Sequence, residues 1–110
     1  MLVSVVIRTL NEQRYLRELL LAVRSQKSDL FTIETVIIDS GSVDSTIEIA
    51  KEFGCRVTYI SREDFTFGRS LNFGCEYAKG QIFVLISGHC VPTDENWLHN
   101  LVVPIAEGLV

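Results

Sequence analysis

Asp39 is the residue of this sequence whose type and position most directly suggest chemistry. It ends the apolar run in the stretch VIIDSGSVDST, residues 36–46, and a second acid, Asp44, follows a Ser-Gly-Ser segment. A carboxylate at the end of a strand can accept hydrogen bonds from its own loop, as a turn former does. It can equally accept the ring N–H of a pyrimidine base. The residue types alone leave both roles of Asp39 open.

Polar side chains also follow the other apolar runs, at the point where each run ends. In a parallel α/β sheet the carboxyl ends of the strands share one edge, and ligands bind beyond that edge. The pattern therefore predicts a cleft for a polar ligand, although exposed loops are polar in any case. The positions are Arg8, Thr9, Asn11 and Glu12 after the first run, Asp39, Ser40, Ser42 and Asp44 at the second, Ser61, Arg62, Glu63 and Asp64 after the third, and Ser87, Gly88, His89 and Cys90 after the fourth.

The elements that must position these side chains alternate along the chain. Valine-rich apolar runs indicate buried strands, and apolar residues at helical spacing separate them. This alternation predicts the α/β class, with an open, mostly parallel sheet and helices on both faces. Strands are expected at residues 2–7, 32–39, 56–60 and 81–86, and helices at residues 12–26, 46–53, 69–79 and 95–105.

Capping residues mark several of the expected helix ends. Asn11 is expected to cap the first helix, and Asp44 or Ser45 the second. Gly54 lies just past the end of the second helix, where a left-handed residue commonly stops a helix. Pro104 is expected to end or kink the last helix, because proline lacks the backbone N–H that a helix interior needs.

Composition limits the classes of protein that remain. The 110 residues suit one small domain, and a hydrophobic fraction of 47% is enough for a core. A net charge of −4 argues against a general nucleic-acid binder, which needs basic surface. Cys55, Cys75 and Cys90 form no CxxC pair, so buried reduced thiols are expected instead of a disulfide framework or a zinc site.

Two further classes are disfavoured by absent patterns. The chain has neither GxxxxGK[ST] nor a GxGxxG after its first apolar run, which argues against the usual phosphate and dinucleotide loops. No basic leader and no apolar run long enough for a bilayer occur, so a cytoplasmic protein is expected. The chain ends on apolar residues without a stop signal, and we interpret it as a truncated domain.

Four stretches together resemble the N-terminal half of a glycosyltransferase family 2 enzyme of GT-A fold. They are VSVVIRTLNE, VIIDSGSVDST, FGRSLNFGCEYAKG and FVLISGHCVPTDENWL, and they cover nearly the whole chain in the family's order and spacing. The resemblance implies transfer of a sugar from a UDP- or dTDP-linked donor to an acceptor hydroxyl, with inversion, in polysaccharide or glycoconjugate synthesis. It makes residues 1–110 the nucleotide-sugar-binding part of the enzyme.

The resemblance also assigns nucleotide-binding residues. Asp39 matches the acid that reads the base, whereas Leu10 stands where many relatives carry an aromatic residue that stacks on it. Arg69 matches a residue near the base or diphosphate, and its place at a helix N-terminus is unfavourable for a cation unless a ligand is bound. The nucleotide-binding residues that the resemblance implies are Thr9, Asn11, Glu12, Asp39, Ser42, Arg69 and Asn72. Gly41, Asp44, Thr46, Gly68 and Gly74 also match the family's motifs.

The fourth stretch departs from the family pattern. Relatives usually carry Asp-x-Asp there to bind Mg²⁺ or Mn²⁺ under the diphosphate, and this chain has Ser87-Gly88-His89. Mg²⁺ prefers oxygen ligands, and imidazole suits Mn²⁺ better. Three hypotheses remain: His89 is a neutral metal ligand, or it is protonated and offers its charge to the diphosphate, or the site is degenerate. His89 and Ser87 are therefore the candidate contacts for a metal or for the diphosphate.

The resemblance extends to partners and to what this piece lacks. It implies a nucleotide-diphosphate sugar as donor, an acceptor saccharide or lipid-linked glycan, and peripheral membrane association of the full-length protein. The catalytic base is expected beyond Val110, so this piece alone should bind nucleotide weakly and transfer no sugar. A non-catalytic nucleotide-sugar-binding module is the alternative. A receiver-like signalling domain is disfavoured, because Arg8-Thr9 stands where it needs an acidic pair.

Overall fold

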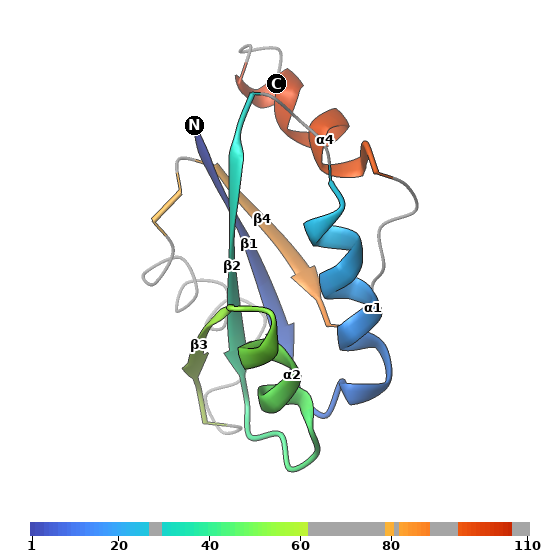
Figure 1. Cartoon of the computed structure of the whole chain (residues 1–110). Coiled ribbons are helices and arrows are strands. Elements are labelled where there is room, and N and C mark those ends of the chain that lie inside the picture. Colours follow the sequence, from blue (N-terminus) through green and yellow to red (C-terminus); the bar gives the residue numbers. More distant parts are fainter. Residues whose placement is uncertain (27–29, 62–78, 81, 89–94, 107–110) are drawn as a thin grey trace.

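A computed structural model of the chain describes residues 1–26, 30–61, 79–80, 82–88 and 95–106 (Figure 1). Strands and helices alternate along these residues, as the sequence predicted. The elements are β1 (Leu2–Thr9), α1 (Gln13–Arg24), β2 (Thr32–Asp39), α2 (Thr46–Glu52), β3 (Arg56–Tyr59), β4 (Ile82–Ser87) and α4 (Trp97–Ala106). The helix expected at residues 69–79 lies outside the described residues.

The four described strands form one parallel sheet in the order β3-β2-β1-β4. The two central strands, β1 and β2, pair over eight residues, from Leu2 with Thr32 to Thr9 with Asp39. Parallel pairing brings all four carboxyl ends to the same edge of the sheet, which is the lower edge in Figure 1. The predicted α/β class with a parallel sheet is confirmed.

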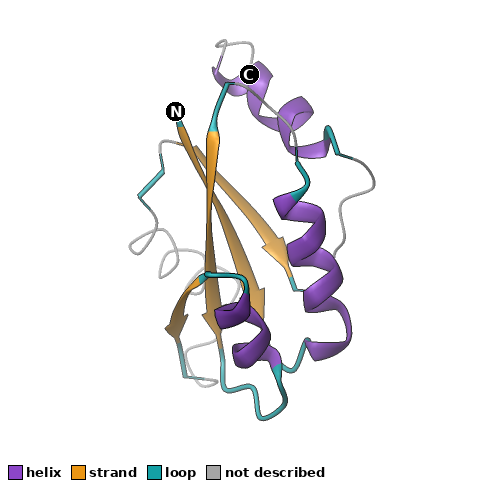
Figure 2. Ribbon diagram, viewed as in Figure 1, coloured by secondary structure: helices purple, strands orange, loops and turns teal. Residues whose placement is uncertain are grey.

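One face of the sheet carries the main apolar core. Strand alternation puts every second side chain on this face, and α1, α2 and α4 all pack against it (Figure 2). Helix α1 buries Leu16, Leu19, Leu20 and Val23, the spacing of an apolar helical stripe. Burying a leucine contributes about 2 kcal/mol of stability, so this stripe fixes α1 on the sheet.

The opposite face holds a smaller apolar cluster. Val6, Val36 and Ile38 are buried there, with Ile60 packed against them. The three described helices do not contribute to this cluster. Helices were predicted on both faces of the sheet, and the fourth predicted helix, at residues 69–79, lies outside the described residues.

The helix ends follow the sequence signals in one case and depart from them in another. Helix α2 stops as predicted at Gly54, whose φ is +72°, with N–H groups of Gly54 and Cys55 donating to Lys51 and Ala50 oxygens. The prediction that Asn11 caps α1 is wrong. The capping position is Glu12, and it makes no side-chain capping hydrogen bond.

Helix α4 extends past its proline. Pro104 was expected to end or kink this helix, but the helix continues to Ala106, so Pro104 lies in its last turn. The start of α4 is joined to the end of α1, where the Leu98 N–H donates to Gln26 Oε1 over 2.8 Å. None of the described helices is both long and apolar enough to span a bilayer.

A polar cluster joins the sheet to the segment before β4, at the end of the sheet away from the predicted cleft. The Ser4 hydroxyl donates to Glu34 over 2.6 Å and accepts the Gly80 N–H over 2.8 Å. Arg56 pairs with Glu34 at 3.2 Å. Burial raises the pKa of Glu34, but the Ser4, Lys79 and Arg56 donors outweigh it, so the net pKa lies below its ordinary value.

Candidate functional site

Backbone hydrogen bonds continue between neighbouring strands just past the last paired residues of the sheet, at the carboxyl ends of the strands. The Ser40 N–H donates to the Thr9 oxygen over 3.1 Å, and the Ile60 N–H donates to the Asp39 oxygen over 2.9 Å. On the other side of β1, the Gly88 N–H donates to the Arg8 oxygen over 2.9 Å. The loops after the strands therefore begin from one rigid edge.

Asp39 is the buried acid at this edge, with only 1% of its surface exposed. Its Oδ1 accepts from the Thr9 hydroxyl over 2.7 Å and from the Ser42 hydroxyl. Its Oδ2 accepts the N–H groups of Gly41 and Ser42 over 2.9 and 2.7 Å. A carboxylate has about four lone-pair sites, and the four donors fill them. The turn-forming role considered for Asp39 is therefore present in the structure.

Five hydrogen bonds join the loop after β1 to the loop after β2, about 30 residues apart in sequence. We call residues 11–13 and 42–46 together the loop clasp. Both loops contribute donors and acceptors, so neither can move without the other. The bonds are Asn11 N to Ser42 Oγ (2.8 Å), Val43 N to Asn11 Oδ1 (2.8 Å), Glu12 N to Thr46 Oγ1 (2.8 Å), Gln13 N to Asp44 Oδ2 (3.3 Å) and Ser45 N to Gln13 Oε1 (3.0 Å).

Asp44 ties the loop clasp to the start of α2. Its Oδ1 accepts both the hydroxyl and the N–H of Thr46, the latter over 2.9 Å. Ser45 occupies the capping position without a side-chain capping bond, so the capping carboxylate is the one before it. Burial raises the pKa of Asp44, but the donors of Thr46 and Gln13 outweigh it, so the net pKa lies below its ordinary value of 3.8.

The lowered pKa of Asp44 predicts an acid-dependent share of stability. A carboxyl whose pKa falls on folding stabilises the protein fully above its unfolded value, here 3.8, and this contribution is lost as the pH falls through the lower folded pKa. We expect Asp44→Asn to unfold at lower urea concentration than the wild type at pH 6, and the difference to shrink toward pH 3. Urea titrations across this range measure it. A difference that stays constant with pH would contradict the role of the carboxylate.

The end of β4 lies directly against the loop clasp. A Cβ placed on Gly88 would come within 2.8 Å of Glu12 Cγ and 3.1 Å of Thr9 Cγ2, so a glycine lets the two segments approach. Ser87 pairs with Arg8 in the sheet. Because strand side chains alternate, Ser87 faces the side of the sheet opposite to Thr9 and Asp39.

The structure brings together most of the predicted site residues that it describes. Thr9, Asp39 and Ser42 share the carboxylate network, and Asn11 and Glu12 belong to the loop clasp beside it. Ser87 lies at the same edge but outside this network. Arg69, Asn72 and His89 fall outside the described residues, as do Cys75 and Cys90.

Three residues outside the predicted nucleotide-binding set also belong to this site, although Ser40 stood among the polar strand-end residues and Thr46 matched the family's motif. Thr46 is fully buried and accepts the Glu12 N–H, Gln13 binds the Ser45 N–H, and Ser40 is buried against Thr9. The Asp-Ser-Thr run before a helix was a usable signal for Thr46, since such residues satisfy free N–H groups at helix starts. Gln13 had no comparable local signal.

The residues described at the end of β4 do not by themselves fit a divalent cation. Mg²⁺ and Mn²⁺ need several oxygen or imidazole ligands, and Ser87 supplies one neutral hydroxyl while Gly88 supplies no side chain. Within the described ranges, no three His, Cys, Asp or Glu side chains gather in a way that could hold a metal.

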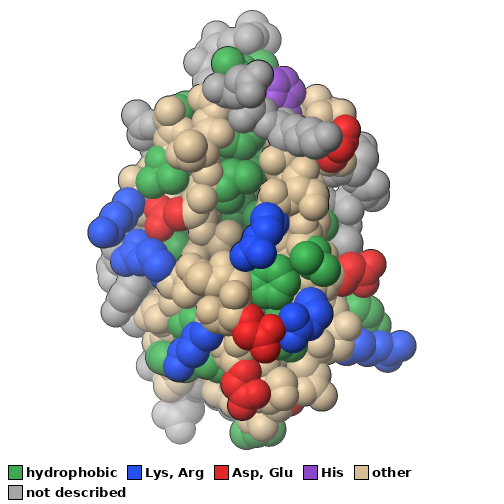
Figure 3. All heavy atoms as spheres, in the orientation of Figure 1, with side chains coloured by type: hydrophobic (Ala, Val, Ile, Leu, Met, Phe, Trp, Pro, Cys, Tyr) green, Lys and Arg blue, Asp and Glu red, His purple; other side chains and the backbone are tan. Residues whose placement is uncertain are grey.

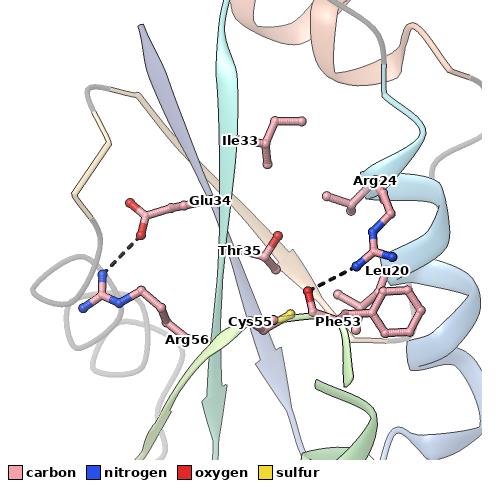
Figure 4. A pocket seen from close by; sticks show the side chains of 10 residues that line it. Leu20, Arg24, Ile33, Glu34, Thr35, Phe53, Cys55 and Arg56 are labelled. Carbon is pink, nitrogen blue, oxygen red and sulfur yellow. Dashed lines mark hydrogen bonds and ion pairs between the residues drawn. The ribbon is translucent and has the colours of Figure 1, made fainter. Parts of the chain in front are cut away.

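A hollow of about 470 Å³ lies elsewhere on the molecule, between α1 and the amino-terminal halves of β2 and β3 (Figure 4). Arg24 covers the Phe53 ring at 4.7 Å and donates to the Phe53 oxygen over 3.3 Å. Cys55 in its wall is a free, half-buried thiol, and burial raises its pKa to about 11, so it stays neutral. Thr9 and Asp39 do not line this hollow, and the chemistry predicted for the strand ends lies away from it.

The surface over α1 and α2 mixes charges of both signs. Figure 3 shows basic and acidic side chains interspersed on this face, without a large patch of one sign. Arg17 of α1 and Glu52 of α2 form an ion pair at 2.8 Å. Both side chains are about half exposed, so the pair contributes little stability.

The fold is a parallel α/β domain with a network of polar side chains at the carboxyl ends of its strands. The chain belongs to glycosyl transferase family 2, whose family model matches residues 4–110. An uncharacterised glycosyltransferase of Rickettsia typhi is 33% identical over 87 residues, which are 78% of this chain and 26% of that protein. Glycosyltransferase AglE of Haloferax volcanii is 33% identical over 108 residues, 94% of this chain and 35% of that protein. The chain thus spans about a quarter to a third of these relatives.

Solved structures show the same fold. The structure of S. aureus TarS in complex with UDP matches 97% of this chain and 32% of its own, with a TM-score of 0.82 and 21% identity. A mannosyltransferase of Pyrobaculum calidifontis, solved with GDP-Man and Mn²⁺, matches 91% of this chain and 31% of its own, with a TM-score of 0.75 and 25% identity. These likenesses confirm the predicted GT-A fold.

Proposed function

We propose that this chain is the nucleotide-sugar-binding part of a glycosyltransferase that uses a UDP- or dTDP-linked sugar and an acceptor hydroxyl, with inversion. One observation carries the proposal: Asp39 is a buried carboxylate at the carboxyl end of β2, held by four donors, of which the Thr9 hydroxyl is one. Such an acid accepts an N–H group but repels phosphate, so it suits the base of the nucleotide.

The base N–H reaches Asp39 by replacing a hydroxyl donor. Two of its four donors are backbone N–H groups fixed by the loop, and two are hydroxyls that can rotate. Ser42 is the more accessible of the two hydroxyls, since Thr9 is 1% exposed and Ser42 is half-buried. In this proposal the Ser42 hydroxyl turns away from Oδ1 when the base binds. We also assign Arg69 and Asn72 to the nucleotide site, because the stretch that contains them resembles a nucleotide-binding motif of the family.

Sugar transfer then proceeds by in-line displacement. The acceptor hydroxyl oxygen forms a bond to the anomeric carbon while the bond from that carbon to the diphosphate oxygen breaks. A carboxylate base, proposed beyond Val110, takes the acceptor proton, and the diphosphate leaves with the bonding electron pair. We place Ser87 and His89 near the diphosphate, where a protonated imidazole would stabilise the charge of the leaving group.

Two of the similar solved structures support testing this chain with nucleotides and with Mn²⁺. TarS was solved with UDP, and the mannosyltransferase with GDP-Man and Mn²⁺. The acceptor is proposed to be a saccharide or a lipid-linked glycan, with peripheral membrane association of the longer protein. Cys55 is a free thiol, which fits a reducing compartment, and we place the reaction in the cytoplasm.

A non-catalytic nucleotide-sugar-binding module is the second candidate. The Ser87-Gly88-His89 sequence favours it, because this segment lacks both carboxylates of the family pattern. Such a module keeps the Asp39 network and loses metal-dependent binding of the diphosphate.

Calorimetric titration of the chain with UDP and dTDP, each with and without Mn²⁺, tests the proposal. We expect both nucleotides to bind weakly and GDP, whose purine differs in shape, to bind less. Mn²⁺-dependent binding that is lost in His89→Ala would favour the transferase with a metal contact. Metal-independent binding that survives His89→Ala would favour the module. Absence of binding by UDP and dTDP under all conditions would overturn both candidates.

A further inference from the structure

We propose that Asn11 is a positioning residue for Asp39, holding the loop after β2 in the conformation that binds the nucleotide. This inference rests on the proposed function and names a residue that acts through others. Asn11 neither caps α1 nor contacts the Asp39 carboxylate directly. Its contacts are instead with Ser42 and Val43, more than 30 residues along the chain.

The backbone of Asn11 adopts an unusual conformation for this contact. Its φ is +53°, and among the described residues other than glycine it is the one with a positive φ. The left-handed region is costly for most L-residues and tolerated best by asparagine and aspartate. This conformation turns both the N–H and the side chain of Asn11 toward the loop after β2.

The two hydrogen bonds of Asn11 have different targets. Its N–H donates to Ser42 Oγ over 2.8 Å, and the same hydroxyl donates its proton to Asp39 Oδ1. A hydroxyl that receives an N–H on one side is left with its own proton for the other, so Asn11 directs the Ser42 proton to Asp39. The Asn11 Oδ1 meanwhile accepts the Val43 N–H over 2.8 Å.

The two hydrogen bonds of Asn11 have separate roles in this proposal. The bond from the Val43 N–H to Asn11 Oδ1 holds the loop after β2, and it does not depend on the Ser42 hydroxyl, which must leave Asp39 when the base binds. When the base N–H takes the place of the Ser42 hydroxyl at Asp39, the bond from Val43 to Asn11 Oδ1 remains. The N–H groups of Gly41 and Ser42 then stay on Asp39 Oδ2. Because the loop is ordered before the nucleotide arrives, binding does not have to supply the free energy of ordering it.

Three variants of Asn11 separate its side chain from its backbone. Asn11→Asp keeps the acceptor and tolerates the left-handed conformation, so UDP should bind within about twofold of the wild type. Asn11→Gly keeps the conformation and loses the Val43 acceptor, so UDP should bind roughly five- to tenfold more weakly, the effect of one lost hydrogen bond. Asn11→Ala loses the acceptor and adds strain, so it should bind most weakly.

The matched control is Gln26→Ala, which removes a side-chain acceptor of the Leu98 N–H on the far side of the molecule. Titrations are made at a temperature where thermal unfolding shows every variant fully folded. Hydrogen exchange of the Val43 amide, followed by NMR, supplies a readout independent of nucleotide. We expect faster exchange in Asn11→Gly, unchanged exchange in Gln26→Ala, and protection restored in Asn11→Asp.

Each result decides between the two proposals. Equal UDP affinity in Asn11→Gly and the wild type would overturn the positioning role and leave the proposed function standing. Equal hydrogen-exchange rates of the Val43 amide in these two proteins would show that Asn11 Oδ1 does not hold the loop after β2, and would overturn the inference. If the wild type binds neither UDP nor dTDP, the proposed function fails, and any role of Asn11 toward a nucleotide fails with it.

Discussion

Replacing Asp39 by asparagine is expected to lower the free energy of unfolding by about 3 kcal/mol and to abolish detectable nucleotide binding. The buried carboxylate receives two hydroxyls and two backbone N–H groups. An asparagine of the same shape offers one acceptor oxygen, and its amide nitrogen faces two of these donors with hydrogens of its own. With its oxygen on the N–H groups of Gly41 and Ser42, the amide turns its NH₂ toward the Thr9 and Ser42 hydroxyls. Both hydroxyls then lose their acceptor, and the base N–H of a nucleotide loses the carboxylate oxygen that it needs.

Urea unfolding and UDP calorimetry measure the two effects of Asp39→Asn. Glu48→Gln is the matched control, because it removes one negative charge from the exposed first turn of α2. We expect the control to change stability by less than about 0.5 kcal/mol and to leave UDP binding unchanged. An Asp39→Asn protein as stable as this control would contradict the four-donor network.

Replacing Gly80 by alanine is expected to lower the free energy of unfolding by about 3 kcal/mol, for a steric reason. The new Cβ would lie 2.4 Å from Ser4 Oγ, 2.7 Å from Ser4 N and 3.0 Å from the Leu2 oxygen. Two of these atoms belong to the backbone of β1 and cannot move alone. Separating the segments would also break the Gly80 N–H bond to Ser4, whose hydroxyl serves Glu34 as well.

Gly54→Ala provides the comparison for Gly80→Ala. Nothing lies within 4 Å of a Cβ at Gly54, but its φ of +72° strains any other residue. We expect this variant to lose about 1 kcal/mol, from backbone strain alone. Urea unfolding of both proteins measures the difference. Equal losses at the two glycines would contradict the close approach of residues 79–80 to β1.

Local patterns were enough to predict the strands and most of the helices. β2 has the predicted bounds, and Gly54 ends α2 where the glycine signal placed it. These features depend on side-chain period and backbone preference, which act over a few neighbouring residues. The position of Asp39 at a strand end follows from the same local pattern, because the apolar run stops there.

Asn11 shows where local reasoning failed. An asparagine just before a helix is a favoured cap, so its neighbours alone predict capping of α1. Its side chain instead binds Val43, a partner from the loop after β2. When a side chain has two competing partners, the tertiary structure determines which of them lies within hydrogen-bond distance. Local sequence spacing carries no information on the distance between Asn11 and Val43.

The sequence by itself determined the α/β class, the order of elements and the residue types at the strand ends. Only the tertiary structure decided that Thr9 and Asp39 are register partners, that four donors meet on one carboxylate, and that Gly88 lies against Glu12. It also decided that Ser87 faces away from Asp39, since the pairing of Ser87 with Arg8 sets its side of the sheet. The physical reason is that strand register and loop contact arise between segments distant in the chain, where no local period or propensity acts.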